Sequence, residues 1–421
     1  MTADRAPGFL QDRLRVALAA AWAGIAIAAL PLRATFPSSP RWRAIRSFWD
    51  HTSGNIWDTT PAIEAASALA QDPRAPMYTA LARRGSSFIY PPLAAALYGP
   101  FFSDSVAVME RRLAWASRAL ALSILAVLLL YVARGRRGIT VAQGAAIAVT
   151  LVLFHPLARA VQLNQSTLLV TLLVGLAWLA LRRGAEVAAG APLALAIAVK
   201  PHLLLVLPLL GWQARKAALS TLGFGAALLG VSLAYAGWDN HLRYLTQVLP
   251  ALGTGYAFYP NQTFSSFFLR LLTDQPLDSF EIAPPSVARW LSLAAAVITY
   301  AALLSAARRL PRHPALRPHA LGLGWLAATL ASPIAWEHHY APAIFLFVAS
   351  WDAYRDEGSD LPPRLLTPLV LSFTLIASTF WVLDLPRAAA VLVASHVFYG
   401  GLLLAFGYAR LVTAYARYLS G

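Results

Sequence analysis

The chain has 421 residues, of which 58% are apolar and only 13% are charged. A soluble domain carries about a quarter charged residues, so this composition excludes an ordinary soluble protein and indicates an integral membrane protein. There is no cysteine, which excludes disulfides, thiolate metal sites and cysteine nucleophiles. The net charge of +15 comes almost wholly from arginine. In a membrane protein, arginines at the cytoplasmic ends of spans and in contact with anionic membrane lipids explain this charge, and we expect no nucleic-acid partner.

The apolar residues occur in blocks separated by short polar stretches, which is typical of spanning helices. We expect an all-α polytopic protein with about 12 transmembrane helices. The predicted spans are residues 12–33, 113–133, 139–156, 163–181, 186–199, 202–213, 217–236, 287–307, 318–332, 338–351, 365–383 and 388–410. Some of these blocks are short for a full crossing, which favours broken or re-entrant helices. The first block lacks a small-residue cleavage site and is predicted to be an anchor rather than a cleaved signal.

Basic clusters follow alternate spans and predict the topology. They are Arg134/Arg136/Arg137, Arg182/Arg183, Arg215/Lys216, Arg308/Arg309/Arg312 and Arg410. The positive-inside rule places all of them in the cytoplasm, together with both termini. The apolar run 89–102 must then not cross the membrane, and its prolines favour a broken helix. Residues 183–215 are basic at both ends, so we expect two half-helices that enter and return, with Lys200 near the outer side.

This topology leaves two long outer loops, residues 34–112 and 237–286. We find no internal repeat and no appended soluble domain, so residues 1–421 are predicted to form one membrane-embedded domain. Polar clusters gather on the outer side. They contain Asp58, Tyr90, Arg118, Asn164, Lys200, Asn261, Gln262, Trp336, Glu337, His338 and His339.

Ionisable groups at membrane depth are costly and tend to mark substrate paths. Alternative interpretations exist for single clusters. Asp58 is also suited to cap a helix, because Thr59, Thr60 and Pro61 follow it. Lys200 and Arg118 are long enough to snorkel to the interface. Glu337 and its two neighbouring histidines suggest a metal, but adjacent residues point to different faces of a helix.

Further alternatives concern the amides and aromatics. Asn164 and Asn261 both begin N-glycosylation sequons, although the arginine-rich, lysine-poor composition is typical of a bacterial chain. Tyr90 and Trp336 fit an interfacial aromatic belt as well as a sugar site. The common location of the clusters favours one site. A carboxylate, cations, amides and imidazoles together suit binding a phosphate and a sugar while deprotonating a hydroxyl.

Four motifs resemble one family of membrane enzymes. They are an Asp after the first span with a helix ending in Pro76-Met77-Tyr78, then Phe88-Ile89-Tyr90-Pro91-Pro92, then Val199-Lys200-Pro201, and then Ser332-Pro333-Ile334-Ala335-Trp336-Glu337-His338-His339. In these motifs the chain resembles the GT-C superfamily of membrane glycosyltransferases, and within it glycosyltransferase family 87, the bacterial polyprenol-phosphate-mannose-dependent α-(1→2)-mannosyltransferases. The resemblance covers roughly residues 10–410. One departure is Val161, which stands where the family usually has Gly before the amide motif at Gln162.

The resemblance implies a GT-C fold with a large first outer loop and an inverting, metal-independent transferase that needs no cofactor. Asp58 would be the general base. The donor, a polyprenyl-phosphate sugar, would be bound by residues that offer positive charge, amides or a ring. These are Lys200, His338, His339, Arg118, Asn164 and Tyr90. Four further residues would line the acceptor side of the cavity, namely Asn261, Gln262, Glu337 and Trp336.

The resemblance also implies the setting of the reaction. A hexose, mannose above all, would move to a lipid-linked or periplasmic glycan acceptor at the outer face of the bacterial inner membrane. Three alternatives stay open at this stage: a transporter of lipid-linked sugars, a non-catalytic scaffold, and an envelope polysaccharide polymerase or ligase. Transporters often show repeats, and none is visible here.

Overall fold

The computed structural model describes residues 59–72, 74–83, 88–133, 138–278, 287–357, 363–380, 382 and 384–420. In the first half of the chain the helices are α4 (Thr60–Gln71), α5 (Met77–Arg83), α6 (Pro92–Ala96), η1 (Gly99–Phe101), α7 (Val106–Ala133), α8 (Val141–Leu153), α9 (His155–Gln162), α10 (Thr167–Arg182), α11 (Glu186–Val199), η2 (Pro201–Leu205) and α12 (Val206–Gln213). In the second half they are α13 (Arg215–Arg243), the π-helix η3 (Tyr244–Val248), α14 (Leu249–Leu252), α15 (Phe264–Leu272), α16 (Val287–Arg309), η4 (Pro314–Leu316), α17 (Arg317–Ala331), η5 (Glu337–Tyr340), α18 (Ala343–Glu357), η6 (Pro363–Leu365), α19 (Thr367–Ala377), α20 (Arg387–Ala394) and α21 (His396–Ser420).

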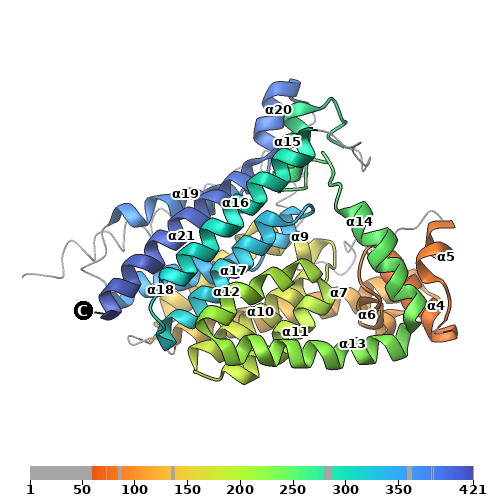
Figure 1. Ribbon diagram of the computed structural model, residues 1–421, viewed down its shortest axis with the longest axis horizontal. Helices are drawn as coiled ribbons and strands as arrows, with labels where there is room; N and C mark the ends of the chain where they lie inside the picture. Colours follow the sequence, from red (N-terminus) through yellow and green to blue (C-terminus); the bar gives the residue numbers. More distant parts are fainter. Residues whose placement is uncertain are drawn as a thin grey trace, which may run out of the picture.

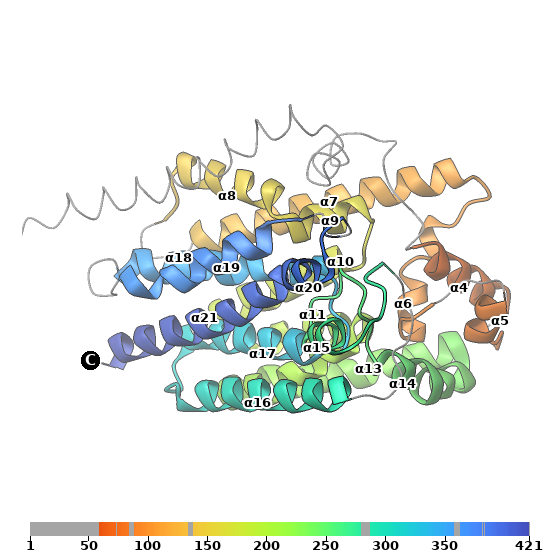
Figure 2. The same ribbon diagram turned by 90° about the horizontal axis from the view of Figure 1, so that it is seen from above.

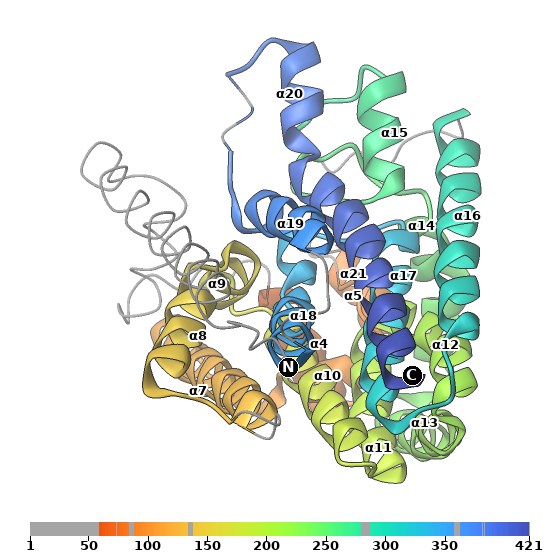
Figure 3. The same cartoon turned by 90° about the vertical axis from the view of Figure 1, so that its left-hand side faces the viewer.

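The described part of the chain consists of helices and connecting loops and contains no strand, only one isolated bridge between Asn261 and Trp336. The predicted all-α fold is therefore confirmed. Long helices run along the molecule, and α4, α5, α6 and α14 gather at one end (Figures 1 and 2). Viewed along the long axis of the molecule, α7 and α8 lie on one side of the bundle and α16 lies on the other (Figure 3).

In the described part of the chain, four stretches are long and apolar enough to cross a membrane: Val106–Ala133, Arg215–Leu252, Val287–Arg309 and Arg387–Leu419. The bent pair α8 and α9, which meet at 58°, would make a fifth. The predicted span 12–33 lies outside the described residues, and the predicted number of about 12 spans is not confirmed, because α10, α11, η2–α12 and α19 are too short. The longest of these has 16 residues and measures about 24 Å at a rise of 1.5 Å per residue, against a hydrocarbon core of about 30 Å.

Burial differs sharply among these helices. In the candidate spans of α13 and α16 only 22% of the most apolar window is buried, whereas 61% is buried in the span that contains α21. Exposed aliphatic side chains cover the outer faces of α13 and α16, for example Leu219, Leu222, Val297 and Ile298. Such wide apolar surfaces suit contact with lipid. The helices α17 and α21 instead pack at the centre of the main core.

The stretch from Arg182 to Arg215 leaves one end of the bundle and returns to it. The backbone N–H of Lys216 donates to Glu186, and a Cβ on Gly190 would meet Ser220, so α11 and α13 run parallel from a common end. The chain between them must therefore return through η2 and α12, as the predicted half-helices do, while their entry into a membrane stays a prediction. The turn at Lys200 lies at the opposite end from the basic residues.

Three of the predicted basic clusters meet at that common end. Arg317 pairs with Glu186 at 3.2 Å, and the indole of Trp212 donates to the carbonyl of Arg308 at 3.1 Å. The helix α21 also ends on this side (Figure 2). A fourth predicted cluster, Arg134/Arg136/Arg137, lies outside the described residues. A shared side for these clusters agrees with the predicted topology, while the compartment that this side faces stays a prediction.

The run 89–102 forms only a five-residue helix and a three-residue 3₁₀ turn, so it does not cross, as predicted. Together with α4 and α5 it builds a second, smaller apolar core, which also contains Ala236 and Tyr244 from the α13 region. The helix α13 bends at Gly237, whose φ of 69° and ψ of 164° suit only glycine. Beyond this bend, Asn240 binds the α4–α5 turn through the carbonyl of Ala75 and the N–H of Met77.

Candidate active site

Lys200 lies at the break between α11 and η2, outside the four candidate spans. The helix ends here because Pro201 has no N–H and restricts the residue before it, which adopts φ −131° and ψ 88°. The side chain is only 5% exposed, and its Nζ lies 2.5 Å from Nε2 of His339. Burial lowers the pKa of Lys200 to about 7, because a desolvated ammonium is costly. A bound anion would restore the charge.

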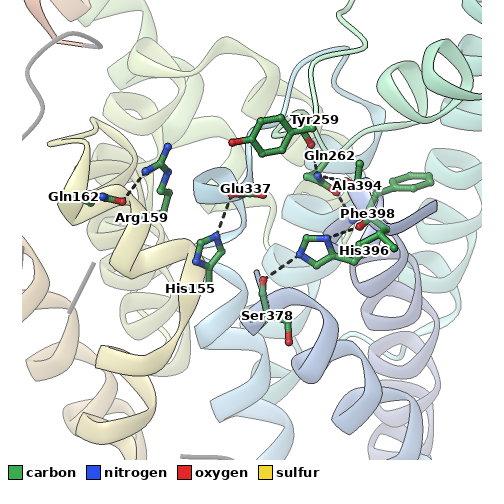
Figure 4. A network of polar contacts seen from close by, with 11 residues as sticks. His155, Arg159, Gln162, Tyr259, Gln262, Glu337, Ser378, Ala394, His396 and Phe398 are labelled. Atoms are coloured by element: carbon green, nitrogen blue, oxygen red, sulfur yellow. Dashed lines mark hydrogen bonds and ion pairs between the residues drawn. The ribbon is translucent and has the colours of Figure 1, made fainter. Parts of the chain in front are cut away.

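The two histidines lie on η5, which follows the end of α17 at Ser332-Pro333. Its first residue, Glu337, pairs with Nε2 of His155 at 3.0 Å (Figure 4). Its last residue, Tyr340, donates its hydroxyl to the carbonyl of Gln262 at 2.7 Å. Nε2 of His338 and Nδ1 of His339 are buried and have no hydrogen-bond partner in the described part of the chain. Buried polar atoms without partners are rare in folded proteins, so these two nitrogens suit a polar ligand.

The amide motif lies beside this turn, at the junction of α9 and α10. Asn164 adopts a left-handed conformation with φ of 50°, and its Oδ1 accepts from the hydroxyl of Ser117 at 2.9 Å. Its Nδ2 is buried without a partner among the residues that the structure describes. The next residue, Gln165, accepts from the hydroxyl of Tyr90 at 3.2 Å. Arg118 follows Ser117 on α7, is 8% exposed, and lies over the ring of Trp115.

Tyr90 connects the donor-side residues. The Nζ atom of Lys200 lies 5.9 Å from the centre of its ring, and the hydroxyl of Tyr78 donates to its carbonyl at 2.7 Å. Lys200 thus contacts the ring nitrogen of His339 and lies over the ring of Tyr90. Gln165 joins them through Tyr90, and Asn164 is its neighbour. The structure brings these parts together from four regions of the sequence, while their role in binding a donor stays a prediction.

The predicted acceptor-side amides are packed inside the protein. Asn261 and Gln262 are 0% exposed. Oδ1 of Asn261 accepts from the N–H of Ala335, and the amide of Gln262 donates to the carbonyls of Tyr259 and Ala394 (Figure 4). These bonds join two loops to the α20–α21 junction. We therefore assign both residues a bracing role in the described structure, and a contact with an acceptor stays a prediction.

The other two predicted acceptor-side residues also have protein contacts. The ring of Trp336 packs edge-on against Phe258 at 5.4 Å between centroids, beside the bridge to Asn261. The carboxylate of Glu337 forms its hydrogen bond with His155. Burial would raise the pKa of Glu337, but the hydrogen bond from His155 and the electrostatic effects of His155, His396 and Arg159 together lower it below its usual value. The carboxylate is therefore ionised at neutral pH.

Asp58, the predicted general base, lies outside the described residues. The chain is described from Thr59, and α4 begins at Thr60 with Pro61 in its first turn. Residues near Asp58 in sequence belong to the small core, which reaches the site through Tyr78 and Tyr90.

His155 and Arg159, both on α9, were not predicted from the sequence. Arg159 donates to Oε1 of Gln162 at 2.6 Å (Figure 4). Its charge acts on both Glu337 and His338. The sequence did contain a signal for these two residues. A histidine and an arginine follow directly after a strongly apolar block, and ionisable residues in such positions often mark a functional site. In the described part of the chain no group of three or more histidine, aspartate or glutamate side chains is arranged to hold a metal ion. A metal-independent reaction stays a prediction.

The sequence profile of glycosyltransferase family 87 matches residues 88–333, more than half of the chain. This range includes Tyr90, Asn164 and Lys200 and ends just before the turn with the two histidines. Comparison with curated proteins gave no match, and comparison with solved structures gave none. The match agrees with the motifs and with the polar site at one end of an all-helical bundle. The chain belongs to glycosyltransferase family 87, and it is a glycosyltransferase with membrane helices.

Proposed function

We propose that this glycosyltransferase moves a hexose, specifically mannose, from a polyprenyl-phosphate donor to a lipid-linked or periplasmic glycan acceptor with inversion at the anomeric carbon. One observation carries the proposal. A buried lysine and two imidazoles with unpartnered nitrogens meet at the end of the bundle opposite the basic clusters. That arrangement suits one phosphate group, which offers several strong acceptors and a negative charge.

The chemistry follows from this placement. The acceptor hydroxyl attacks the anomeric carbon, a new C–O bond forms, and the bond to the phosphate oxygen breaks. Asp58 takes the hydroxyl proton, and the electron pair of the broken bond leaves with the prenyl phosphate. Negative charge therefore grows on the phosphate in the transition state, where Lys200 and the turn of His338 and His339 stabilise it.

The donor class is tested by reconstituting the purified protein in lipid vesicles with polyprenyl-phosphate mannose, polyprenyl-phosphate glucose and a nucleotide-linked mannose, each isotopically labelled. Mass spectrometry of extracted glycolipids then identifies the product. We expect label transfer from the prenyl-phosphate mannose. Transfer from the nucleotide-linked sugar alone would refute the donor class. Label that crosses the vesicle membrane without a new glycosidic bond would show transport instead.

A further inference from the structure

A buried histidine–glutamate pair joins two helical segments next to the Lys200–His339 contact. Nε2 of His155, the first residue of α9, lies 3.0 Å from Oε2 of Glu337, the first residue of η5. The two side chains are only 2% and 10% exposed, although the residues are 182 positions apart. The helix α9 and the turn η5 also pack against each other. A buried carboxylate needs such a partner, so this contact fixes the relative position of the two segments.

Glu337 begins the turn that carries both imidazoles of the site. Its backbone N–H donates to the carbonyl of Pro260 at 3.0 Å, and Tyr340 closes the turn on Gln262. The turn is thus held at both ends. The structure describes all four residues of this turn. His338 and His339 lie between the two anchors, and each has one buried ring nitrogen without a hydrogen-bond partner in the described part of the chain.

The pair also defines the proton position on His155. A carboxylate only accepts hydrogen bonds, so Nε2 of His155 must carry a proton. Nδ1 of the same ring is buried and has no partner in the described part of the chain. A neutral imidazole carries one N–H proton, so Nδ1 is then unprotonated.

We propose that His155 and Glu337 are positioning residues for the transfer reaction. His155 holds Glu337, and Glu337 fixes the turn so that His339 reaches Lys200 and His338 offers Nε2 to the donor phosphate. The identity of that ligand rests on the proposed function, whereas the pair itself does not. The pair resembles the carboxylate–histidine contacts that orient reactive groups in other enzymes, in which the outer partner acts only through the group that it holds.

The expected effect is on turnover more than on binding. A displacement of about 1 Å in a catalytic group costs on the order of 100-fold in rate. The phosphate gains charge in the transition state, so a misplaced turn lowers kcat more than it raises KM for the donor. The KM for the acceptor should not change, because neither residue of the pair contacts it in this scheme.

The kinetic test compares His155→Phe and Glu337→Leu, which remove the bond, with His155→Gln, which keeps an N–H donor at this position. We expect the first two variants to lower kcat by about 10- to 100-fold and the glutamine variant to retain most of the activity. The double variant His155→Phe/Glu337→Leu should be no slower than either single variant, because both remove one interaction. Normal turnover in His155→Phe, or independent losses that multiply in the double variant, would overturn the proposal.

A matched control is His319→Gln. His319 is also buried and forms a hydrogen bond with the hydroxyl of Tyr408 at 2.7 Å. It differs from His155 in its location, because it lies in the first turn of α17, at the basic end of the bundle opposite the Lys200 site. This variant should lower thermal stability and leave kcat per folded molecule unchanged. An equal loss of kcat in this control would reduce His155 to a general structural role and overturn its assignment.

A second measurement needs no substrate. Nitrogen NMR of vesicle-embedded protein with ¹⁵N-labelled histidine distinguishes protonated from unprotonated ring nitrogens, and the His155 signals are those missing in His155→Gln. We expect Nε2 to be protonated and its signal to shift in Glu337→Leu. A His155 that carries its only proton on Nδ1 would overturn the pair. If the wild type uses another sugar donor, the proposed function fails by itself, and the kinetic comparison is made with that donor.

Discussion

Nζ of Lys200 and Nε2 of His339 lie 2.5 Å apart although 139 positions separate the two residues in the chain. The imidazole nitrogen must be unprotonated to accept from the lysine, so at most one proton lies between them. This contact holds the lysine in a buried position with no carboxylate partner among its described contacts. An incoming phosphate would therefore meet a cation that no acidic group neutralises.

Donor affinity should fall as pH rises above about 7. Burial lowers the pKa of Lys200 to about 7, so the free protein loses the ammonium proton above this pH, and binding an anion must take the proton back. A phosphodiester donor does not titrate in this range. We expect the Kd for a donor analogue to rise by up to about tenfold per pH unit above pH 7, in line with the linkage of one proton.

The control for this prediction is Lys200→Arg, since a guanidinium stays charged throughout. Its Kd should be nearly independent of pH between about 6 and 9. Isothermal titration at several pH values measures both proteins. The same pH slope in the arginine variant would assign the titration to another group.

Asp58→Asn should lower the transfer rate by about 100- to 10,000-fold, because an amide cannot accept the acceptor proton. Donor binding should persist, since the phosphate contacts come from other residues. The matched control is Asp72→Asn, in the same predicted outer loop, where the carboxylate is exposed and accepts from the N–H of Arg74. Initial rates and donor Kd are measured in parallel. An active Asp58→Asn protein would remove this residue as the base.

Gln262→Ala should lower the free energy of unfolding by about 3 kcal/mol. The side chain is 0% exposed, and its loss leaves the carbonyl of Ala394 and the N–H of Phe398 buried without these partners. For comparison, Gln143→Ala removes a capping interaction at the start of α8 and should cost about 1 kcal/mol or less. Denaturant titration in detergent measures both. A stable Gln262→Ala protein with weak acceptor binding would instead support the acceptor contact expected from the sequence.

Gly237→Ala should destabilise the protein by about 1–3 kcal/mol, because the bend in α13 uses a backbone conformation that alanine adopts only under strain. Gly230→Ala, seven residues earlier, is the control. A Cβ there meets nothing within 4 Å, and alanine favours a helix, so this variant should be neutral or slightly stabilising. Melting temperatures of the two variants give the comparison. Equal effects would show that the bend at position 237 carries no strain cost.

Much of the helical pattern was predictable, because apolar block length and proline positions are local properties. The predicted span 186–199 coincides with α11, and the predicted block 287–307 lies within α16. The block 139–156 was predicted as one span, but the chain bends by 58° at Phe154 and continues as α9. The proline at position 156 suits the first turn of a helix, but the sequence alone does not show whether a separate helix begins there or the preceding helix continues with a kink.

The site was predictable in its residue types and less so in its contacts. Lys200 and His339 were expected together, since both stood next to helix breaks on one side. Gln262 was expected at a substrate because it is polar, yet an amide binds buried backbone groups equally well. His155 was missed because only the tertiary packing of α9 on η5 shows that it has an acidic partner 182 residues later.

The turn at Lys200 also has a consequence for biosynthesis. At about 5–20 residues per second, the ribosome reaches His339 on the order of ten seconds after Lys200. During that interval a 14-residue apolar helix ending in a lysine must enter the translocation machinery before its imidazole partner has been made. The nascent lysine therefore lacks its imidazole partner during this interval, and we expect α11 to reach its final packing only after His339 has been made.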